Sequence, residues 1–155
     1  MKDQLLKKLQ DEITALDREL KTDLPREIRR ARELGDLREN AEYHAAKERQ
    51  TFVQARLAML QKRFATVSML DLERLPHGKA ALGSTVHLLD DSGAEVVYHL
   101  VMPEEANPDK GMISASSPIG RALLGKEEGD EIVVQTPLGR KQFELRRLVT
   151  IHDVQ

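Results

Sequence analysis

The chain has 155 residues, carries a formal net charge of −2 and contains no cysteine. This composition excludes disulfides and thiolate metal sites, and it argues against binding nucleic acid through general positive charge. The N-terminal stretch carries acidic residues from position 3, unlike a signal peptide, and no run approaches the roughly 20 apolar residues of a membrane span. We therefore expect a cytoplasmic protein with no membrane partner.

Glycine separates two parts of the chain. Gly35 is the single glycine before position 76, and the rest of the nine follow it. Long charged sequence without glycine favours extended helices, whereas valine-containing sequence interrupted by glycine favours strands and turns. We predict an α+β protein with two domains, residues 1–75 and residues 76–155.

Residues 1–75 contain two apolar seams with alternating spacings of four and three. The first seam is Leu9, Ile13, Leu16 and Leu20, and the second is Val53, Leu57, Leu60, Phe64 and Val67. Such seams are typical of coiled coils. We predict an antiparallel coiled-coil helical hairpin about 45 Å long, with a kink or break at Pro25. Its turn, which we call the tip, falls at about residues 34–43.

Two carboxylates, Asp36 and Glu39, lie three residues apart in the tip. One interpretation is a capping box, in which Asp36 caps the second helix, Glu39 reaches back, and Gly35 ends the first helix in a left-handed conformation. The other is a pair of hard oxygen ligands for Mg²⁺, which takes few protein carboxylates and keeps several waters. Two carboxylates alone would hold the ion weakly, so a partner would have to complete the site.

Other tip residues also allow two interpretations. Arg32 and Arg38 are either part of a solvated helix face or guides toward phosphate groups. Asn40 and Tyr43 either contact a nucleic-acid base or pack against the turn. The five histidines show no spacing typical of zinc ligands.

Residues 76–155 predict a small, mostly antiparallel sheet with one short helix. Residues 84–89 and 95–102 flank "DDSG" as a hairpin, residues 112–115 form a short strand, and residues 131–136 and 141–151 flank "PLG" as a second hairpin. In "SSPIGRALLG", Ser117 suits the N-cap of a helix, and Pro118 suits its first position.

Two separated stretches carry a family resemblance. "ARELGDLRENAEYHAAKERQ" (residues 31–50) resembles the tip of bacterial Gre transcript cleavage factors of the GreA type. "SPIGRALLGKEEGDEIVVQTPLGR" (residues 117–140) is similar to the body of their C-terminal domain. The resemblance extends over nearly the whole chain, with both stretches in the family's order.

The resemblance implies a transcription elongation factor. In this family the coiled coil enters the secondary channel of bacterial RNA polymerase, and an FKBP-like C-terminal domain docks on the channel rim. The factor, expected as a monomer, then stimulates the polymerase's own Mg²⁺-dependent cleavage of the backtracked RNA 3′ end. It is not an enzyme alone and has no cofactor of its own. Asp36 and Glu39 match the two acidic residues that help to bind the polymerase's second Mg²⁺.

The resemblance also assigns contacts to other residues. Arg32, Arg38, Asn40 and Tyr43 match the tip that approaches RNA and the active centre, and Arg49 and Arg56 are further candidates for RNA contact. The polymerase-docking loop matches Ser116, Ser117 and Pro118, although related sequences often carry Asn or Asp where this chain has Ser116.

Three other functions are weighed against this one. A non-cleaving regulator that occupies the same channel would not need Asp36 and Glu39. A prolyl isomerase would need an aromatic-lined pocket, whereas residues 76–155 contain only Tyr98 and Phe143 as aromatic residues. A coiled-coil scaffold unrelated to transcription would have no affinity for RNA polymerase.

Overall fold

The computed structural model describes residues 2–35 and 39–153. Internal contacts group the chain into two compact units, which we call the helical unit, Met1–Leu70, and the sheet unit, Asp71–Gln155. The α+β fold class predicted from the sequence is confirmed. Within the described ranges, no helix combines the length and apolar character needed to cross a membrane.

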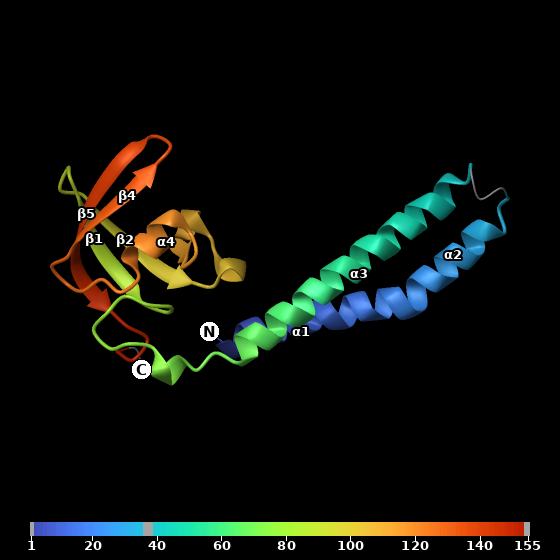
Figure 1. Cartoon of the computed structure of the whole chain (residues 1–155), viewed down its shortest axis with the longest axis horizontal. Helices are drawn as coiled ribbons and strands as arrows, with labels where there is room; N and C mark the ends of the chain where they lie inside the picture. The colour runs from blue at the N-terminus through green and yellow to red at the C-terminus, as the bar shows by residue number, and fades with distance from the viewer. Residues whose placement is uncertain (1, 36–38, 154–155) are drawn as a thin grey trace. The chain divides into compact units, whose positions relative to one another are not determined.

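The helical unit is an antiparallel hairpin (Figure 1). Its elements are α1 (Lys2–Arg18), a π-helical turn (Glu19–Asp23), α2 (Leu24–Arg32) and α3 (Ala41–Ser68). We call α1 to α2 the outgoing arm and α3 the returning arm. A hydrogen bond joins the start of the outgoing arm to the residues just after the returning arm: Lys2 Nζ donates to the carbonyl oxygen of Leu70 at 2.6 Å. At about 1.5 Å per residue, the 28 residues of α3 span about 42 Å.

The apolar seam of the hairpin runs further than the sequence pattern indicates. Leu9 and Ile13 on α1 and Val53, Leu57, Leu60 and Val67 on α3 are buried as predicted, whereas Leu16, Leu20 and Phe64 are half-buried. On the outgoing arm the seam continues through Leu24, Ile28 and Ala31, all buried. The hairpin is therefore packed along its length up to the last turn of α2.

The predicted interruption at Pro25 takes the form of the π-helical turn, which ends two residues before it. Proline lacks an N–H and its ring crowds the carbonyl four residues back, so a regular α-helix cannot continue unchanged through it. In addition, the seam residues Leu16, Leu20 and Leu24 follow one another at spacings of four, which exceed the 3.6 residues of an α-helical turn. A wider π turn takes up this excess and returns the seam to α3.

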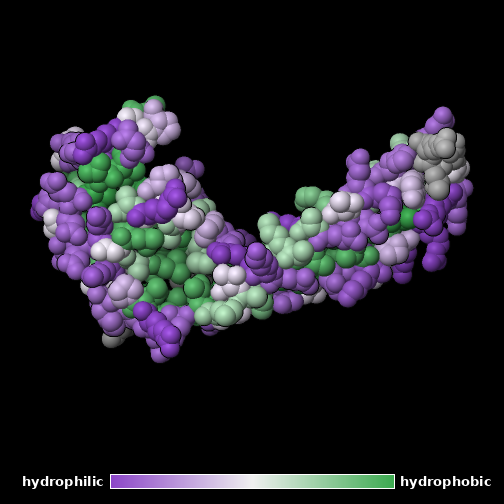
Figure 2. All heavy atoms as spheres, in the orientation of Figure 1, coloured by the Kyte–Doolittle hydropathy of each residue, from purple (hydrophilic) through white to green (hydrophobic). Residues whose placement is uncertain are grey.

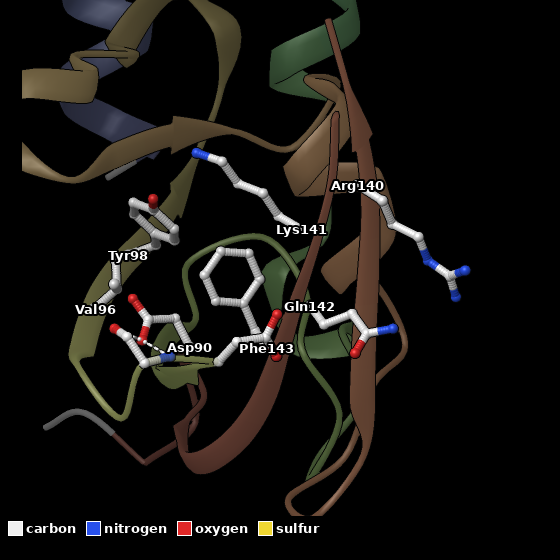
Figure 3. Close-up of a pocket in the computed structure, with 9 residues that line it drawn as sticks. Asp90, Val96, Tyr98, Arg140, Lys141, Gln142 and Phe143 are labelled. Atoms are coloured by element: carbon white, nitrogen blue, oxygen red, sulfur yellow. Dashed lines mark hydrogen bonds between the residues drawn. The ribbon is translucent and has the colours of Figure 1, made fainter. Parts of the chain in front are cut away.

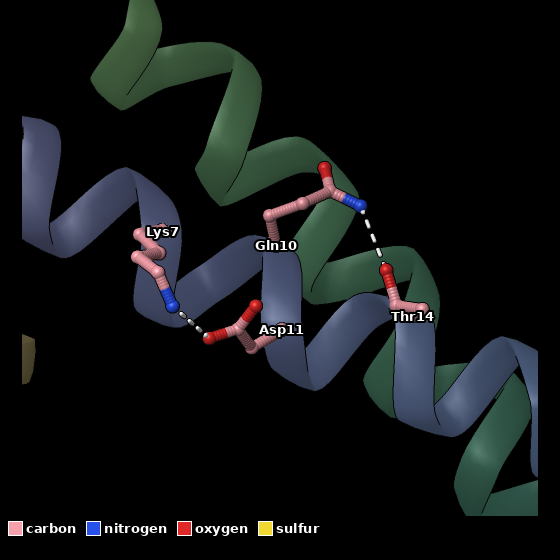
Figure 4. Close-up of polar contacts among 4 residues, drawn as sticks. All are labelled: Lys7, Gln10, Asp11 and Thr14. Carbon is pink, nitrogen blue, oxygen red and sulfur yellow. Dashed lines mark hydrogen bonds and ion pairs between the residues drawn. The ribbon is translucent and has the colours of Figure 1, made fainter.

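The outward face of α1 is polar. On α1, Lys7 Nζ lies 3.0 Å from Asp11 Oδ2, and Gln10 Nε2 donates to Thr14 Oγ1 at 3.1 Å (Figure 4). The face of the helical unit seen in Figure 2 is mostly hydrophilic. Exposed pairs of this kind add only about 0.2–0.5 kcal/mol each, so the buried seam carries the stability of the hairpin.

The sheet unit holds five strands and one α-helix. They are β1 (Thr85–Asp90), β2 (Glu95–Val101), β3 (Met112–Ser114), α4 (Pro118–Leu123), β4 (Glu131–Thr136) and β5 (Gly139–Val149), with short 3₁₀ turns at Leu72–Arg74, Pro103–Glu105 and Pro108–Lys110. The strand order is β3-β2-β1-β5-β4. Both predicted hairpins are confirmed as antiparallel pairs, and β3 pairs with β2 in parallel.

The core of the sheet unit is aliphatic. Val86, Leu88, Leu100, Leu123, Ile132 and Leu145 are fully buried. Phe143 joins them at the edge of the core, with Tyr98 half-buried beside it. In Figure 3 these two rings and Lys141 border a hollow of about 350 Å³, whereas the Arg140 side chain leads away from the rings. The low aromatic content of the sequence is explained by a core of branched aliphatic side chains.

Candidate functional site

The outgoing arm ends in a turn before the tip. α2 ends at Arg32, and the N–H of Leu34 donates to the carbonyl oxygen of Ala31 at 3.1 Å. Gly35 follows with a φ of 133°, a value that side chains with a Cβ rarely adopt. The predicted positive φ at Gly35 is confirmed, but the prediction that Gly35 ends the first helix is wrong, because α2 ends at Arg32 and Glu33 is its C-cap. Asp36 and Arg38 lie outside the described residues.

The returning helix is capped by Asn40, not by Asp36. The Asn40 Oδ1 accepts from the N–H of Tyr43 at 3.0 Å, and α3 begins at Ala41. The capping-box interpretation of the sequence is therefore wrong, because Glu39 precedes the cap instead of occupying the third helical position. Asp and Asn are equally good caps, so local sequence did not distinguish a start after residue 36 from a start after residue 40.

Asn40 also reaches across the hairpin. Its Nδ2 donates to the carbonyl oxygen of Ala31 at 2.5 Å, while its Oδ1 serves the cap. One half-buried amide thus joins the last turn of α2 to the first turn of α3. Of the two roles that the sequence left open for Asn40, the structure shows packing against the turn.

Glu39 is exposed and lies directly before this cap. The first turn of α3 contains a different acidic residue, Glu42. The carboxylate of Glu39 is thus presented at the turn of the hairpin, the end of the helical unit opposite to Lys2 and Ser68. Its relation to Asp36 stays a prediction, since Asp36 is outside the described residues.

Arg32 and Tyr43 meet across the turn. The Arg32 Cζ lies 5.8 Å from the centroid of the Tyr43 ring, a cation–π distance, and the His44 ring lies edge-on to Tyr43 at 5.7 Å between centroids. Two residues that the sequence analysis placed in one site are therefore neighbours, although they come from different helices.

Two hollows in the hairpin near the tip differ in charge. A shallow hollow of about 490 Å³ is lined by Arg29, Arg32 and Lys47, with Glu33 as its one acidic residue. A second hollow of about 430 Å³ has two basic and two acidic lining residues: Arg30, Arg49, Glu27 and Glu42. The residues that line the first hollow are therefore net positive, and those that line the second are balanced in charge.

Two other candidate cations are held in ion pairs along the hairpin. Arg49 Nε and Nη2 donate to the two carboxylate oxygens of Glu19 at 2.7 and 2.9 Å, and Arg56 Nε donates to Glu12 at 3.0 Å. The hydrogen bonds from Arg49 lower the pKa of Glu19 below its ordinary value of 4.5. Because Glu19 lies in the π-helical turn, this pair ties that turn to α3.

The loop before α4 is held by its own serines. The Ser117 Oγ accepts from the N–H of Gly120 at 3.1 Å and donates to the carbonyl oxygen of Ser114 at 2.7 Å. The predicted cap at Ser117 and the predicted helix start at Pro118 are both confirmed. Ser116 is exposed, and its Oγ lies 2.7 Å from the Ser114 Oγ. The three candidate docking residues thus lie together at the start of α4, where serine hydrogen bonds hold the turn.

Within the part of the chain that the structure describes, no group of three or more His, Cys, Asp or Glu side chains could hold a metal ion. A pair of histidines does come together that the sequence spacing did not reveal: the His77 and His152 rings stack at 3.8 Å between centroids. His152 Nε2 lies 2.6 Å from the carbonyl oxygen of Leu75. This contact fastens the start of the sheet unit to its last turn.

Comparison with known proteins gives consistent matches along the chain. Residues 2–68 match the family model described as "Transcription elongation factor, N-terminal", and residues 75–147 match "Transcription elongation factor, GreA/GreB, C-term". The transcription elongation factor GreA of Nitratiruptor is 50% identical over 139 residues, covering 89% of this chain and 85% of that protein. GreA of Desulfotalea psychrophila is 45% identical over 145 residues, covering 93% and 90%. Among solved structures, the GreA factor homolog Gfh1 of Thermus thermophilus is 28% identical, with a TM-score of 0.42 and coverage of 93% and 94%.

Proposed function

We propose that this chain, which belongs to the GreA/GreB family of transcription elongation factors, stimulates transcript cleavage by bacterial RNA polymerase. The tip would enter the secondary channel of the polymerase, and the polymerase would cleave the extruded 3′ end of a backtracked RNA. The chain would act as a monomer in the cytoplasm and would not be an enzyme by itself.

The observation that carries this proposal is the place of Glu39. Its carboxylate is exposed at the turn of a long hairpin and lies outside the cap of α3, which Asn40 supplies. An acidic group there contributes nothing visible to the packing of the hairpin seam. It is suited to entering a narrow opening in a larger partner.

The donor set fits a shared Mg²⁺ ion. Asp36 and Glu39 would supply two hard carboxylate oxygens, which Mg²⁺ accepts alongside water and phosphate ligands. In phosphodiester hydrolysis by two metal ions, one ion activates the attacking water. The two carboxylates would hold and orient that ion only while the tip is inserted, so hydrolysis would stay slow during ordinary elongation.

The cations of the tip would serve the RNA. Arg32 and Lys47 line the net-positive hollow, which would face the extruded strand. Arg38, next to Glu39 in the sequence, would add a further positive charge. The Tyr43 ring, which has Arg32 over one face, would contact an RNA base. Any contact between Asn40 and RNA would have to be made beside its hydrogen bonds in the turn.

The sheet unit would dock on the polymerase. The turn at Ser116, Ser117 and Pro118 supports this role because three hydrogen bonds between serine hydroxyls and backbone groups hold its backbone before any partner binds. A preformed loop loses little conformational entropy on binding. This turn would determine where the factor docks on the polymerase, and the tip would stimulate RNA cleavage.

A cleavage assay on a purified, halted and backtracked RNA polymerase complex tests the proposal. The expected result is a cleavage rate that rises with added factor and saturates. The same titration, repeated with a competitor that occupies the secondary channel, should show the stimulation disappear. Binding to the polymerase without any gain in cleavage would refute the proposal and identify a non-cleaving channel regulator. Absence of binding to the polymerase would also refute the proposal and would favour a coiled-coil scaffold unrelated to transcription.

A further inference from the structure

We infer that Asn40 is a positioning residue of the tip. Its side-chain amide binds both α2 and α3 and thereby fixes the position of the neighbouring residue, Glu39. The inference rests on the proposed function, because it assigns Asn40 a part in the same cleavage reaction. Asn40 would not touch the metal ion or the RNA. It would act through Glu39, the residue directly before it.

The contacts of the Asn40 amide are divided between the two arms of the hairpin. The oxygen accepts from the N–H of Tyr43 on α3 at 3.0 Å, and the nitrogen donates to the carbonyl oxygen of Ala31 on α2 at 2.5 Å. The Ala31 side chain is itself buried, with 3% of its surface exposed. The amide therefore anchors the turn to the packed end of the seam.

The amide chemistry is specific to this arrangement. A carboxylate at position 40 could accept from Tyr43 but would place a second acceptor against the carbonyl oxygen of Ala31. A serine hydroxyl could cap α3 but is too short to reach the other arm. Cap propensity alone does not favour Asn here, because Asp and Ser cap about equally well. The contact to Ala31 is what distinguishes the amide.

The consequence falls on Glu39. Consecutive Cα atoms are about 3.8 Å apart across a planar peptide, so the backbone of Asn40 fixes the peptide that carries Glu39. Asn40 itself is held in an extended conformation, with φ −83° and ψ 97°. Catalytic geometry tolerates little error, and a displacement of about 1 Å can cost about a hundredfold in rate.

The test compares Asn40→Ser and Asn40→Asp with the unchanged chain. Both variants keep a competent N-cap for α3 and lose the donor to Ala31. A matched control is Gln10→Ser, which removes an exposed side-chain amide from α1, where Gln10 donates to Thr14 (Figure 4). Circular dichroism verifies that helix content is retained in all three variants.

Two quantities are measured on the halted complex: the affinity for the polymerase and the cleavage rate at saturating factor, each across a Mg²⁺ titration. We expect both Asn40 variants to bind like the unchanged chain, to cleave at least about tenfold more slowly at saturation, and to need more Mg²⁺ for half-maximal rate. Gln10→Ser should match the unchanged chain in all three readouts.

Saturating rates within twofold of the unchanged chain in both Asn40 variants would overturn the inference while leaving the proposed function intact. A loss of affinity with an unchanged saturating rate would also overturn it, since the amide would then serve only the stability of the turn. If the unchanged chain itself fails to stimulate cleavage, the proposed function fails, and this inference falls with it.

Discussion

Replacing Gly120 by alanine should destabilise the sheet unit and disturb the candidate docking turn. A Cβ at this position would lie 2.1 Å from the carbonyl oxygen of Ser114 and 3.0 Å from the Cα of Ala115. Both atoms belong to the backbone, so no side-chain rotation relieves the overlap. The turn would have to move.

The size of the effect follows from what holds Ser114 in place. Its carbonyl oxygen accepts from the N–H of Ser117 at 3.0 Å and from the Ser117 Oγ at 2.7 Å. Each such hydrogen bond contributes about 1 kcal/mol, and overpacking adds about 1–3 kcal/mol. Alanine regains about 1 kcal/mol over glycine in a helix. We expect a net loss of about 2–4 kcal/mol in the free energy of unfolding of the sheet unit.

Urea unfolding measures this loss. In a Tyr43→Phe background, Tyr98 is the one remaining tyrosine, and its fluorescence reports on the sheet unit because the chain has no tryptophan. Arg121→Ala, an exposed change on the same helix, is the control and should alter the free energy by less than about 0.5 kcal/mol. An unfolding midpoint for Gly120→Ala equal to that of the control would refute the steric reasoning.

Three further predictions concern stability. The hydrogen bonds from Arg49 lower the pKa of Glu19, so this pair should stabilise the helical unit above the ordinary pKa of 4.5 and lose that effect as pH falls through the lower folded value. Urea unfolding between pH 6 and 3 should show a loss of up to about 1 kcal/mol from this pair, and the loss should be smaller in high salt. The Glu19→Gln variant should lack this pH-dependent loss. Leu60→Ala empties a buried seam position and should lower the helical unit's free energy of unfolding by about 2–5 kcal/mol, seen as a lower helix-melting temperature by circular dichroism. Ser117→Ala removes the cap of α4 and should cost about 1 kcal/mol in urea unfolding of the sheet unit, whereas no measurable cost would contradict the capping role.

Local sequence signals predicted the elements that depend on local chemistry. The predicted strand over residues 131–136 coincides with β4, and Ser117 caps α4 as expected. These features depend on alternation, turn residues and a cap within a few positions of one another. The pairing of β3 with β2 in parallel could not be predicted in this way, because it depends on where the connecting loop returns the chain.

The tip shows where local signals are ambiguous. "GDLREN" contains two adequate caps, Asp36 and Asn40, and the pattern of a capping box favoured the first. In the structure Asn40 is the cap, and its amide also donates to the carbonyl oxygen of Ala31. This hydrogen bond joins two helices, so no local sequence pattern could indicate it. The seam likewise continues past Leu20 only because the π-helical turn rotates Leu24 back toward α3.

The central claim is that the tip carboxylates complete a magnesium site in the polymerase. Its most direct test is the saturating cleavage rate of the double variant Asp36→Asn, Glu39→Gln on a backtracked complex, with the exposed Glu48→Gln as a control for the loss of a single carboxylate charge elsewhere on α3. The account predicts that the double variant still binds the polymerase but cleaves at least about a hundredfold more slowly, equivalent to about 2.7 kcal/mol of barrier, while the control retains its rate. A bound double variant that cleaves within twofold of the unchanged chain would contradict it.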